Sequence, residues 1–439
     1  MNRSKVTLIV FQLLGIGLFA QLPETLELQQ AVALAIEHNF QVKLARADAD
    51  IAALNNHAGE AGFLPELNLD FDANQSDQDI NLTFFSGESV NQENARSQSL
   101  SGLARLEWTL FDGMRMFATR DRLNAIEEMT RQQFQWQVEN TIAEVVHRYG
   151  DILVAEKMLE FNRSNLAYSR RLYEIAEDKL EKGIGNRTES LRLAADYYAD
   201  SSMVIRQGND VSIQKHRFCY LLGINPTDNF ELTDLPDRMM DFSLNDILEN
   251  TQTGNPELLI NKYRQAIAKQ TIREERSAFL PTLGTYGVYQ DVRQINEVGI
   301  LERNFTNGFN YGLRLQWNLF DGNRNRRYVQ QAHIAAQTME WEQEDLERKV
   351  KSEAIALWKE YLSAEQIGRL EEKSNVLAEE NLSLSVDRFE RGIAEDIDVR
   401  EARRNLTETQ LRMLQAKSEQ YNATAEILKL TGKGRSILE

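Results

Sequence analysis

One eight-residue pattern occurs twice in this 439-residue chain, as LEWTLFDG at residues 106–113 and as LQWNLFDG at residues 315–322. A Phe-Leu-Pro triplet also returns, from 63–65 to 279–281, after 216 residues, whereas the octapeptide returns after 209. The chain is therefore a tandem duplication in which all the variation in length lies between the proline and the tryptophan. The stretch before each octapeptide varies as a loop does, and the stretch after it keeps its length.

The stretches after the octapeptides are predicted to be long helical hairpins. Neither contains proline, and residues 113–182 are rich in strong helix formers. Seventy helical residues would reach about 105 Å. A reversal at Gly183 or at Gly392 is followed by a returning helix of roughly 35 residues, which ends near Leu222 or Leu430.

Apolar residues within these stretches repeat at helical spacing. The first stretch has one apolar face. The second has two apolar rows: one row has a residue at every seventh position, and the other alternates steps of three and four residues with a single polar interruption. The three rows are Ile142, Val146, Tyr149 and Leu153; Leu370, Leu377 and Leu384; and Leu411, Leu414, Ser418, Tyr421, Ala425 and Leu428. Such rows are expected to be the apolar seams along which the helices pack.

Between each proline and tryptophan the apolar period changes from 3.6 residues to 2, which predicts strands with one apolar and one polar face. The expected β-hairpins cover residues 66–111 and 282–320, with strands of about 10 residues and polar tips at about 75–99 and 293–306. An apolar row opposite a row that carries Arg105, Glu107 and Arg314 is typical of transmembrane barrel strands. A soluble hairpin packed on a core is the alternative.

Two further features concern the membrane. Trp108 and Trp317 stand close to the strand ends, as aromatic residues at a membrane interface do. Residues 1–20 are predicted to be a secretory signal peptide, because basic Arg3 and Lys5 precede an apolar stretch of about fourteen residues that is too short to span a bilayer. No later segment reaches 18 consecutive apolar residues, so strands are expected to make any membrane crossing.

Composition argues against several classes of function. The net charge of −17 disfavours a nucleic-acid partner, which needs basic patches to neutralise phosphate. Cys219 is the single cysteine, so no disulfide can form within the chain. Glu144 and His147 have the spacing of half a di-iron site, but no second motif of that kind exists. We expect no catalysis, no metal and no cofactor.

Four strands cannot close a cylinder, and open edges in hydrocarbon would leave backbone groups unpaired at a cost of several kcal/mol each. The chain must therefore contribute its strands to a barrel shared with other copies. Eight strands leave an interior filled by side chains, whereas twelve or more leave room for a channel. The polar face favours a channel.

The hairpins that end in Trp-x-Leu-Phe-Asp-Gly, the helices that follow Asn39 and Asn255 and lead to Phe-Leu-Pro, and the Gly-Ile reversals together resemble the TolC family of outer-membrane efflux proteins. The resemblance covers about residues 25–431. It implies a mainly α fold with a transmembrane β-barrel portion, in which a homotrimer in the bacterial outer membrane forms a twelve-stranded barrel and a periplasmic α-helical tunnel.

The resemblance also implies partners and site residues. A periplasmic adaptor would contact the helix-reversal tips, and an inner-membrane pump of RND, ABC or major-facilitator type would supply the substrate. The tip residues are Gly183, Ile184, Gly392 and Ile393. Lipid of the outer membrane would surround the barrel.

Acidic residues after the reversals are the candidate periplasmic gate. Asp398 and Glu401 match the positions where two aspartates narrow the tunnel mouth in the family, and three chains would gather six carboxylates about one axis. The alternative is an ordinary solvated pair near a helix N-terminus. Glu189 and Arg192 stand at the matching offsets of the first repeat.

Some family members hold the mouth closed with a tyrosine and an arginine, and the corresponding positions here are Phe389 and Ala394. Arg391 and Arg400 are the nearby residues that could replace them.

The sequence thus predicts a signal peptide at 1–20, a first repeat at 21–222, a linker at 223–241 and a second repeat at 242–439. Each repeat would contain a helix, a β-hairpin and a long helical hairpin. The expected function is that of a passive exit duct for small molecules in a tripartite efflux system. The exit channel of a type I protein secretion system and a non-transporting coiled-coil envelope scaffold are the alternatives.

Overall fold

The structure is a computed structural model that describes residues 25–227, 229–235, 240–299, 301–391, 393 and 396–438. The predicted signal peptide, Gly392 and Ala394 lie outside the described residues, and Phe389 is described by its backbone alone. The chain forms two compact units, and each draws on both repeats. Unit 1 is made of Met1–Lys43, Gln137–Gly254 and Ser352–Glu439, and unit 2 is made of Leu44–Trp136 and Asn255–Lys351.

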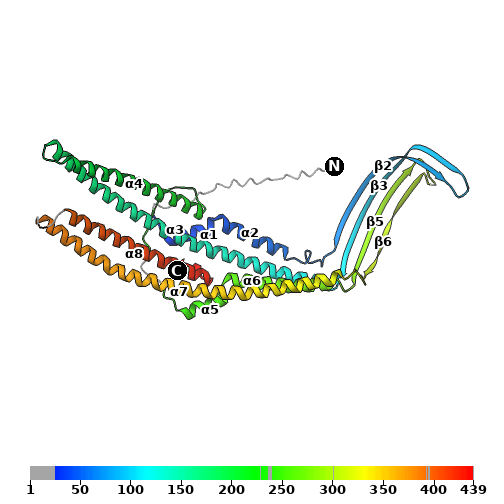
Figure 1. Ribbon diagram of the computed structural model, residues 1–439. Helices are drawn as coiled ribbons and strands as arrows, with labels where there is room; N and C mark the ends of the chain where they lie inside the picture. The colour runs from blue at the N-terminus through cyan, green and yellow to red at the C-terminus, as the bar shows by residue number, and fades with distance from the viewer. Residues whose placement is uncertain are drawn as a thin grey trace, which may run out of the picture. The chain divides into compact units, whose positions relative to one another are not determined.

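Unit 2 contains a four-stranded antiparallel sheet (Figure 1). Its strands follow the order β2 (Glu66–Thr83), β3 (Ser89–Phe111), β5 (Thr282–Asn296) and β6 (Arg303–Gln316). The central pair, β3 and β5, joins the first repeat to the second. β2 and β6 are the edge strands, so the outer edge of each offers backbone groups for a further strand.

The strands are longer than the sequence pattern predicts, with 18, 23, 15 and 14 residues instead of about 10. Much of the segment 75–99, expected as a polar tip, is a paired two-stranded ribbon in which Gln75 lies opposite Gln98 and Thr83 lies opposite Ser89. Ladder hydrogen bonds join main-chain groups and need no apolar side chains. The end of the apolar alternation therefore does not mark the end of the strand.

Both predicted helical hairpins are present. α3 (Arg115–Glu181) and α7 (Arg324–Glu390) each contain 67 residues, and α4 (Arg187–Leu222) and α8 (Asp396–Leu430) return over 36 and 35 residues. The division between the two units falls within α3 and α7. None of the described helices combines the length and the apolarity that crossing a membrane requires.

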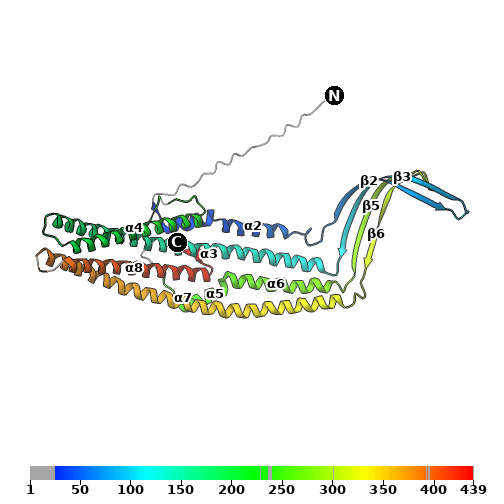
Figure 2. The ribbon, with the colours of Figure 1, turned by 45° about the horizontal axis from the view of Figure 1, so that its top comes forward.

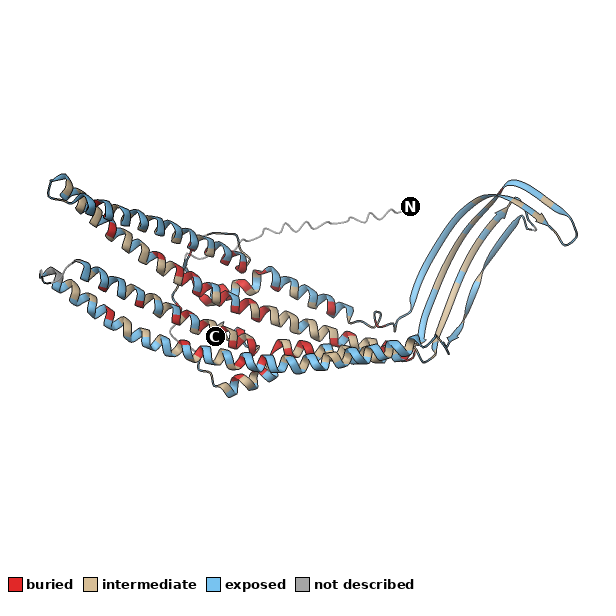
Figure 3. Cartoon of the chain, viewed as in Figure 1, coloured by how far each residue is buried: buried red, intermediate tan, exposed pale blue. Residues whose placement is uncertain are grey.

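The core of unit 1 forms around α3, where the predicted apolar face is buried (Figure 3). The Tyr149 hydroxyl lies 2.9 Å from the Leu26 carbonyl oxygen and 2.7 Å from the Thr233 carbonyl oxygen. Burial raises the pKa of Tyr149, so the hydroxyl remains a donor. It thereby links α3 to the small parallel sheet of β1 (Thr25–Leu26) and β4 (Glu231–Leu232).

Shorter helices complete both units. α1 (Leu28–His38), α5 (Leu244–Gly254) and the 3₁₀ helix η1 (Gly434–Leu438) belong to unit 1, and α6 (Pro256–Ser277) belongs to unit 2. α2 (Phe40–Asn55) begins in unit 1 and continues into unit 2. Asn39 and Asn255 cap α2 and α6, because their side-chain oxygens accept hydrogen bonds from the first backbone N–H groups of these helices.

Within unit 1 the four long helices lie side by side in the order α4, α3, α8, α7, as both ribbon views show (Figures 1 and 2). Leu159 of α3 packs against Val211 of α4. α3 meets α8 closely at Gly150, where an added Cβ would lie 2.2 Å from the Ser418 Oγ. An ion pair of 3.1 Å joins Arg412 of α8 to Glu371 of α7.

The two predicted seams of the second repeat have different environments. The row on α8 is buried or half-buried, as expected. The row on α7, made of Leu370, Leu377 and Leu384, is exposed in the chain, so its role as a packing seam stays a prediction. Spacing in steps of seven shows that a helix face is apolar but does not identify the neighbour that covers it.

Candidate channel wall and gate

Each octapeptide leads from the end of a strand into a long helix, from β3 into α3 and from β6 into α7, and its final Asp-Gly pair lies in the turn. The Asp112 carboxylate accepts a hydrogen bond of 2.8 Å from the Met116 backbone N–H, and Asp321 accepts the equivalent bond of 2.8 Å from Asn325 and one of 3.1 Å from Arg324. These bonds satisfy N–H groups that have no partner inside the helix. Gly113 and Gly322 have φ angles of +73° and +71°, which glycine adopts most readily.

Each octapeptide tryptophan is bonded to the Phe-Leu-Pro triplet of its own repeat. Trp108 Nε1 donates to the Phe63 carbonyl at 2.9 Å, and Trp317 Nε1 donates to the Phe279 carbonyl at 3.0 Å. Both rings remain partly exposed, and Trp317 follows the last residue of β6. The repetition of both motifs was the sequence signal for this contact, although spacing alone does not show which atoms meet. The interfacial role of the two rings stays a prediction.

The register of the sheet sorts its side chains as the alternation predicts. Leu67 of β2 lies opposite Leu106 of β3, which in turn lies opposite Gly287 of β5. Gly287 lies opposite Tyr311 of β6, so one apolar row crosses all four strands. This apolar face includes Leu67, Leu69, Phe71, Leu106, Trp108, Tyr289, Phe309, Tyr311 and Leu313. The opposite face includes Glu66, Asn68, Asp70, Arg105, Glu107, Gln290, Asn310 and Arg314.

The helix reversals of the two repeats share one backbone hydrogen bond. Gly183 has a φ of +74°, and the Ile184 N–H donates to the Lys179 carbonyl at 3.0 Å. In the second repeat the Ile393 N–H donates to the Arg388 carbonyl at 2.9 Å. This bond pattern is typical of a glycine-terminated helix. Both isoleucine side chains are exposed, and their contact with an adaptor stays a prediction.

The candidate gate acids lie where the helices restart. Asp398 and Glu401 are exposed in the first two turns of α8, and their spacing of three residues gives them one helix face. Glu189 is exposed in the first turn of α4, which the Asn186 side chain caps by accepting from the Thr188 N–H at 2.9 Å. Asp398 and Glu401 thus lie on one face of α8 within a chain. Their convergence with the same residues of other copies stays a prediction.

The two arginines considered for closing the mouth make different contacts. The Arg400 guanidinium lies 5.1 Å from the centre of the Tyr168 ring, a cation–π contact that joins the start of α8 to α3. Arg391, which directly follows α7, donates to Asp387 of that helix at 2.8 Å. Arg400 therefore connects the two helical hairpins, whereas this bond of Arg391 joins it only to the end of α7.

His147 pairs with a carboxylate of α8 instead of forming half of a metal site with Glu144. His147 Nε2 lies 3.1 Å from Glu426 Oε1, and Lys429 also contacts Glu426. Burial would raise the pKa of Glu426, but hydrogen bonds from His147 and Lys429 outweigh it and lower the pKa below its ordinary value. In the part of the chain that the structure describes, no cluster of three or more His, Cys, Asp or Glu side chains could hold a metal ion.

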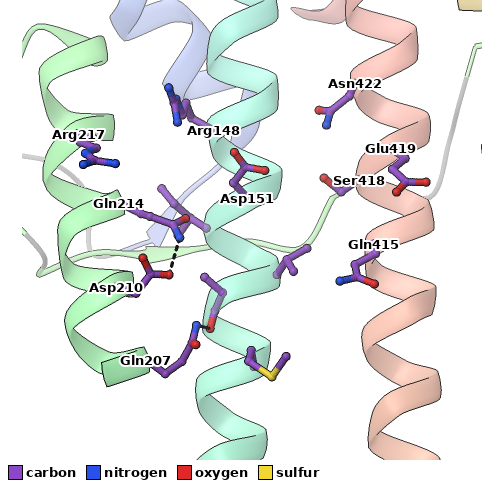
Figure 4. A pocket seen from close by; sticks show the side chains of 14 residues that line it. Arg148, Asp151, Gln207, Asp210, Gln214, Arg217, Gln415, Ser418, Glu419 and Asn422 are labelled. Atoms are coloured by element: carbon purple, nitrogen blue, oxygen red, sulfur yellow. Dashed lines mark hydrogen bonds between the residues drawn. The ribbon is translucent and has the colours of Figure 1, made fainter. Parts of the chain in front are cut away.

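A cavity of about 540 Å³ lies between α3, α4 and α8 within unit 1 (Figure 4). Its lining includes Arg148 and Arg217 together with Asp151 and Asp210, so both cations and carboxylates face it. Gln214 donates to Asp210 at 2.8 Å. A lining of this kind suits water and not an apolar ligand.

Comparison with known proteins gives one family match. The model of the family described as "Outer membrane efflux protein" matches residues 31–216 and 247–433.

Curated proteins with similar sequences come from several bacteria. "Alkaline protease secretion protein AprF" of Pseudomonas aeruginosa is 23% identical over 326 residues, which are 72% of this chain and 65% of that protein. "Outer membrane efflux protein BepC" of Brucella suis biovar 1 is 21% identical over 75% of this chain and 71% of its own. "Nodulation protein T" of Rhizobium leguminosarum bv. trifolii is 24% identical over 88% and 81%.

Solved structures share the fold at low identity. The Campylobacter jejuni CmeC outer membrane channel superposes with a TM-score of 0.74 at 15% identity, over 93% of this chain and 86% of that one. The outer-membrane channel OprN gives a TM-score of 0.70 at 18% identity, over 93% and 90%.

Proposed function

The chain belongs to the outer membrane efflux protein family and is a protein of the outer membrane, and we propose that three copies of it form one passive exit duct through that membrane. The observation that carries the proposal is the sheet of unit 2. It has an apolar face, a polar face and two open edges, which is what one part of a shared transmembrane barrel requires.

Closure by copies of the chain follows from the strand directions. The four strands alternate in direction, so β6 of one copy would run antiparallel to β2 of the next copy, as all the neighbours within the chain do. Two copies would give eight strands and an interior filled by side chains, whereas three copies give twelve strands and room for a channel. The charged polar face supports the wider, water-filled barrel.

The proposed duct has no energy source of its own. Substrate would arrive from an inner-membrane pump of RND, ABC or major-facilitator type through a periplasmic adaptor that contacts the reversal tips. The exposed side chains of Ile184 and Ile393 support such a contact, because apolar residues at the end of a helical hairpin are suited to packing against another protein. The family consists of channel proteins, and we infer no catalytic step for this chain.

A second candidate is the exit channel of a type I protein secretion system. It is favoured by the similarity to AprF, which is described as an alkaline protease secretion protein. Both functions use the same duct, so the cargo distinguishes them. Deletion of the gene in the native bacterium would sensitise cells to small toxic compounds in the first case and would remove a polypeptide from the culture medium in the second.

The test of the proposed duct is assembly followed by conductance. The mature chain purified in detergent should have the mass of a trimer by light scattering, and the same sample should form ion-conducting channels in a planar bilayer. A folded monomer that is stable in water, or a trimer that conducts no ions, would refute the proposal.

A further inference from the structure

The hairpin of β2 and β3 continues beyond the rest of the sheet as a two-stranded ribbon (Figures 1 and 2). The pairing of β3 with β5 ends at Ser97, whereas the pairing of β3 with β2 continues to Ser89. A tilted strand crosses a bilayer with about 9–11 residues, and β2 contains 18. The octapeptides hold the opposite end of the sheet to the long helices. The ribbon, residues 77–96, therefore lies beyond the lipid on the cell-surface side.

A β-bulge lies at the base of this ribbon. The register passes from a pair at Gln78 to the next pair at Ile80, and the extra residue of the bulge is on β3. There Asn94 has a φ of +55°, and its N–H donates to the Asp79 carboxylate at 2.8 Å. Because the extra residue is on β3, β2 keeps its alternation through the bulge. Its even-numbered residues thus stay on the polar face of the sheet, which begins at Glu66.

The distribution of apolar and polar side chains reverses at the bulge. In the four-stranded part of the sheet the odd-numbered residues of β2 are apolar, as Leu67 and Phe71 are. In the ribbon the odd-numbered residues are polar, and they are Asp79, Asn81 and Thr83. The face that would line the channel instead becomes apolar. It carries Ile80, which lies opposite Gln92, and Leu82, which lies opposite Val90. We call Ile80, Leu82 and Val90 the inner ribbon row.

The two environments of a barrel explain only one side of this reversal. The outer surface meets lipid at the level of the bilayer and water beyond it, so a polar outer side is expected on the ribbon. An apolar row that faces a water-filled mouth is not expected for that reason. The three residues of the inner ribbon row are only half-buried within the chain. Apolar side chains in this position need a further neighbour.

The dimensions of a twelve-stranded barrel place that neighbour within reach. A strand spacing of about 4.8 Å and a tilt of about 40° give a barrel radius of about 12 Å. Three ribbons whose packed faces lie about 10 Å apart would each stand about 6 Å from the common axis. Each ribbon would therefore lean inward by about 6 Å over a length of about 20 Å. The ribbon has two strands and free edges, so this lean breaks no pairing with β5.

We propose that the ribbons of three copies meet through their inner ribbon rows and form an apolar constriction at the cell-surface mouth of the duct. This proposal rests on the proposed trimer. The occupant of each row is the ribbon of the other copies, because the rows continue strands that already share one barrel and all turn toward the same axis. An apolar constriction excludes water and dissolved ions until cargo parts its walls. It would keep external solutes out of an idle duct.

Cysteine substitution tests whether the rows meet. Leu82→Cys in the full mature protein, treated with an oxidant that forms disulfides, should give a covalent dimer on a non-reducing gel. The third chain of each trimer should run as a monomer, since one disulfide joins two copies. The native chain measures the background, because Cys219 is buried.

The matched controls are Asn81→Cys and Thr83→Cys. They stand at the same height on the opposite face of β2 and should give several-fold less dimer than Leu82→Cys. Equal dimer yields at the three positions would overturn the proposal. A dimer from Asn81→Cys without one from Leu82→Cys would also overturn it, because the ribbon would then turn its polar face to the axis.

Labelling from outside the cell tests whether the rows close the mouth. Gln290→Cys places a thiol on the polar face of the sheet below the ribbon, and a maleimide with a polyethylene glycol chain is added to intact cells. Adding Leu82→Ser and Val90→Ser should raise the labelling rate several-fold, because a polar mouth stays wet. Asn81→Ser with Asn91→Ser changes the neighbouring cross-strand pair on the other face and should leave the rate unchanged. Equal rates for the two double variants would show that the row forms no constriction.

The same samples separate this inference from the proposed duct. If light scattering and conductance establish a trimeric channel while Leu82→Cys forms no more dimer than Asn81→Cys, the ribbons do not meet and the duct stands. A monomeric parent would refute the duct and the constriction together.

Discussion

At the scale of single residues, the indole N–H groups of Trp108 and Trp317 explain why tryptophan, and not another aromatic residue, stands in both octapeptides. Each N–H donates to a phenylalanine carbonyl of the Phe-Leu-Pro triplet in its own repeat. The sequence could predict that these motifs belong together, because they recur in the same order. The sequence could not predict these hydrogen bonds, because a periodic pattern indicates which side chains are exposed and not which acceptor an N–H group faces.

Replacing either tryptophan with phenylalanine should destabilise the protein. Trp108→Phe and Trp317→Phe keep an aromatic ring but remove one hydrogen bond, and each should lower the free energy of unfolding by about 1 kcal/mol. Denaturant titration of the purified protein measures the change. Trp358→Phe is the control, because the Trp358 Nε1 is buried without an acceptor among the described residues. A loss as large for Trp358→Phe would show that the phenylalanine carbonyl bonds contribute nothing specific.

Gly113 is predicted to tolerate no side chain. In Gly113→Ala the new Cβ would lie 2.4 Å from the Ser277 carbonyl oxygen, and the φ of +73° would add a cost of about 1 kcal/mol for any residue with a Cβ. Gly368→Ala is the matched control, since Gly368 lies inside α7 and an added Cβ would meet no atom within 4 Å outside the local backbone of that helix. Alanine there should be neutral or stabilising by up to about 1 kcal/mol. Thermal unfolding of the two variants would compare them, and equal melting temperatures would contradict the account.

At the scale of helices and strands, the predictable features were those that repeat along one element. The apolar face of α3 with Ile142 and Tyr149 is buried, and the two faces of the sheet separate as the alternation requires. The spacing of the row through Leu377 did not show that this row is exposed in the chain, and the paired ribbon beyond Gln75 was missed. Both results have one physical reason: packing partners and backbone pairing depend on neighbouring segments, which the period of one segment does not report.

The assignment of the two sheet faces predicts opposite effects for neighbouring residues of β6. Leu313→Arg and Leu315→Arg would place a cation on the apolar face, at a cost of roughly 2–4 kcal/mol at the middle of a bilayer and less near its surface. Gln316→Arg lies on the other face, beside Thr282, and should be tolerated. The yield of heat-resistant trimer in outer-membrane fractions measures insertion. Equal yields for the three variants would show that the inner and outer faces have been assigned wrongly.

The junction of α3 and α8 should respond to acid through Glu426. Its pKa in the folded protein lies below the ordinary value of 4.5, so its ion pairs stabilise the fold above about pH 4.5, and this stabilisation is lost as the pH falls through the lowered pKa. Glu426→Gln should therefore destabilise the protein at neutral pH and make its stability less dependent on pH below about 4.5. Thermal unfolding across this range gives the comparison. Parallel pH profiles for the variant and the parent would show that Glu426 is not linked to folding.

At the scale of the whole molecule, one chain holds only half of each contact that closes the proposed duct. The sequence indicated the need for other copies through a count of four strands, and the structure adds two open sheet edges and an exposed apolar row on α7. The proposed gate needs residues from more than one chain, so neither the sequence nor the structure of one chain contains it. Asp398 and Glu401 share a helix face, but the ring they would form depends on three chains meeting about one axis.

Neutralising the proposed gate should change how the channel responds to multivalent cations. If six carboxylates converge, Asp398→Asn with Glu401→Gln should weaken block by trivalent cations added from the periplasmic side and should reduce cation selectivity, because fixed charge in a narrow ring acts more strongly than the same charge on an open surface. Glu189→Gln is the matched control. It should have a smaller effect, since Arg192 stands on the same helix and offsets the charge. Single-channel recording in a planar bilayer measures block and reversal potential. If the double variant is blocked as strongly as the parent, these acids are solvated residues at the start of α8 and the constriction lies elsewhere in the tunnel.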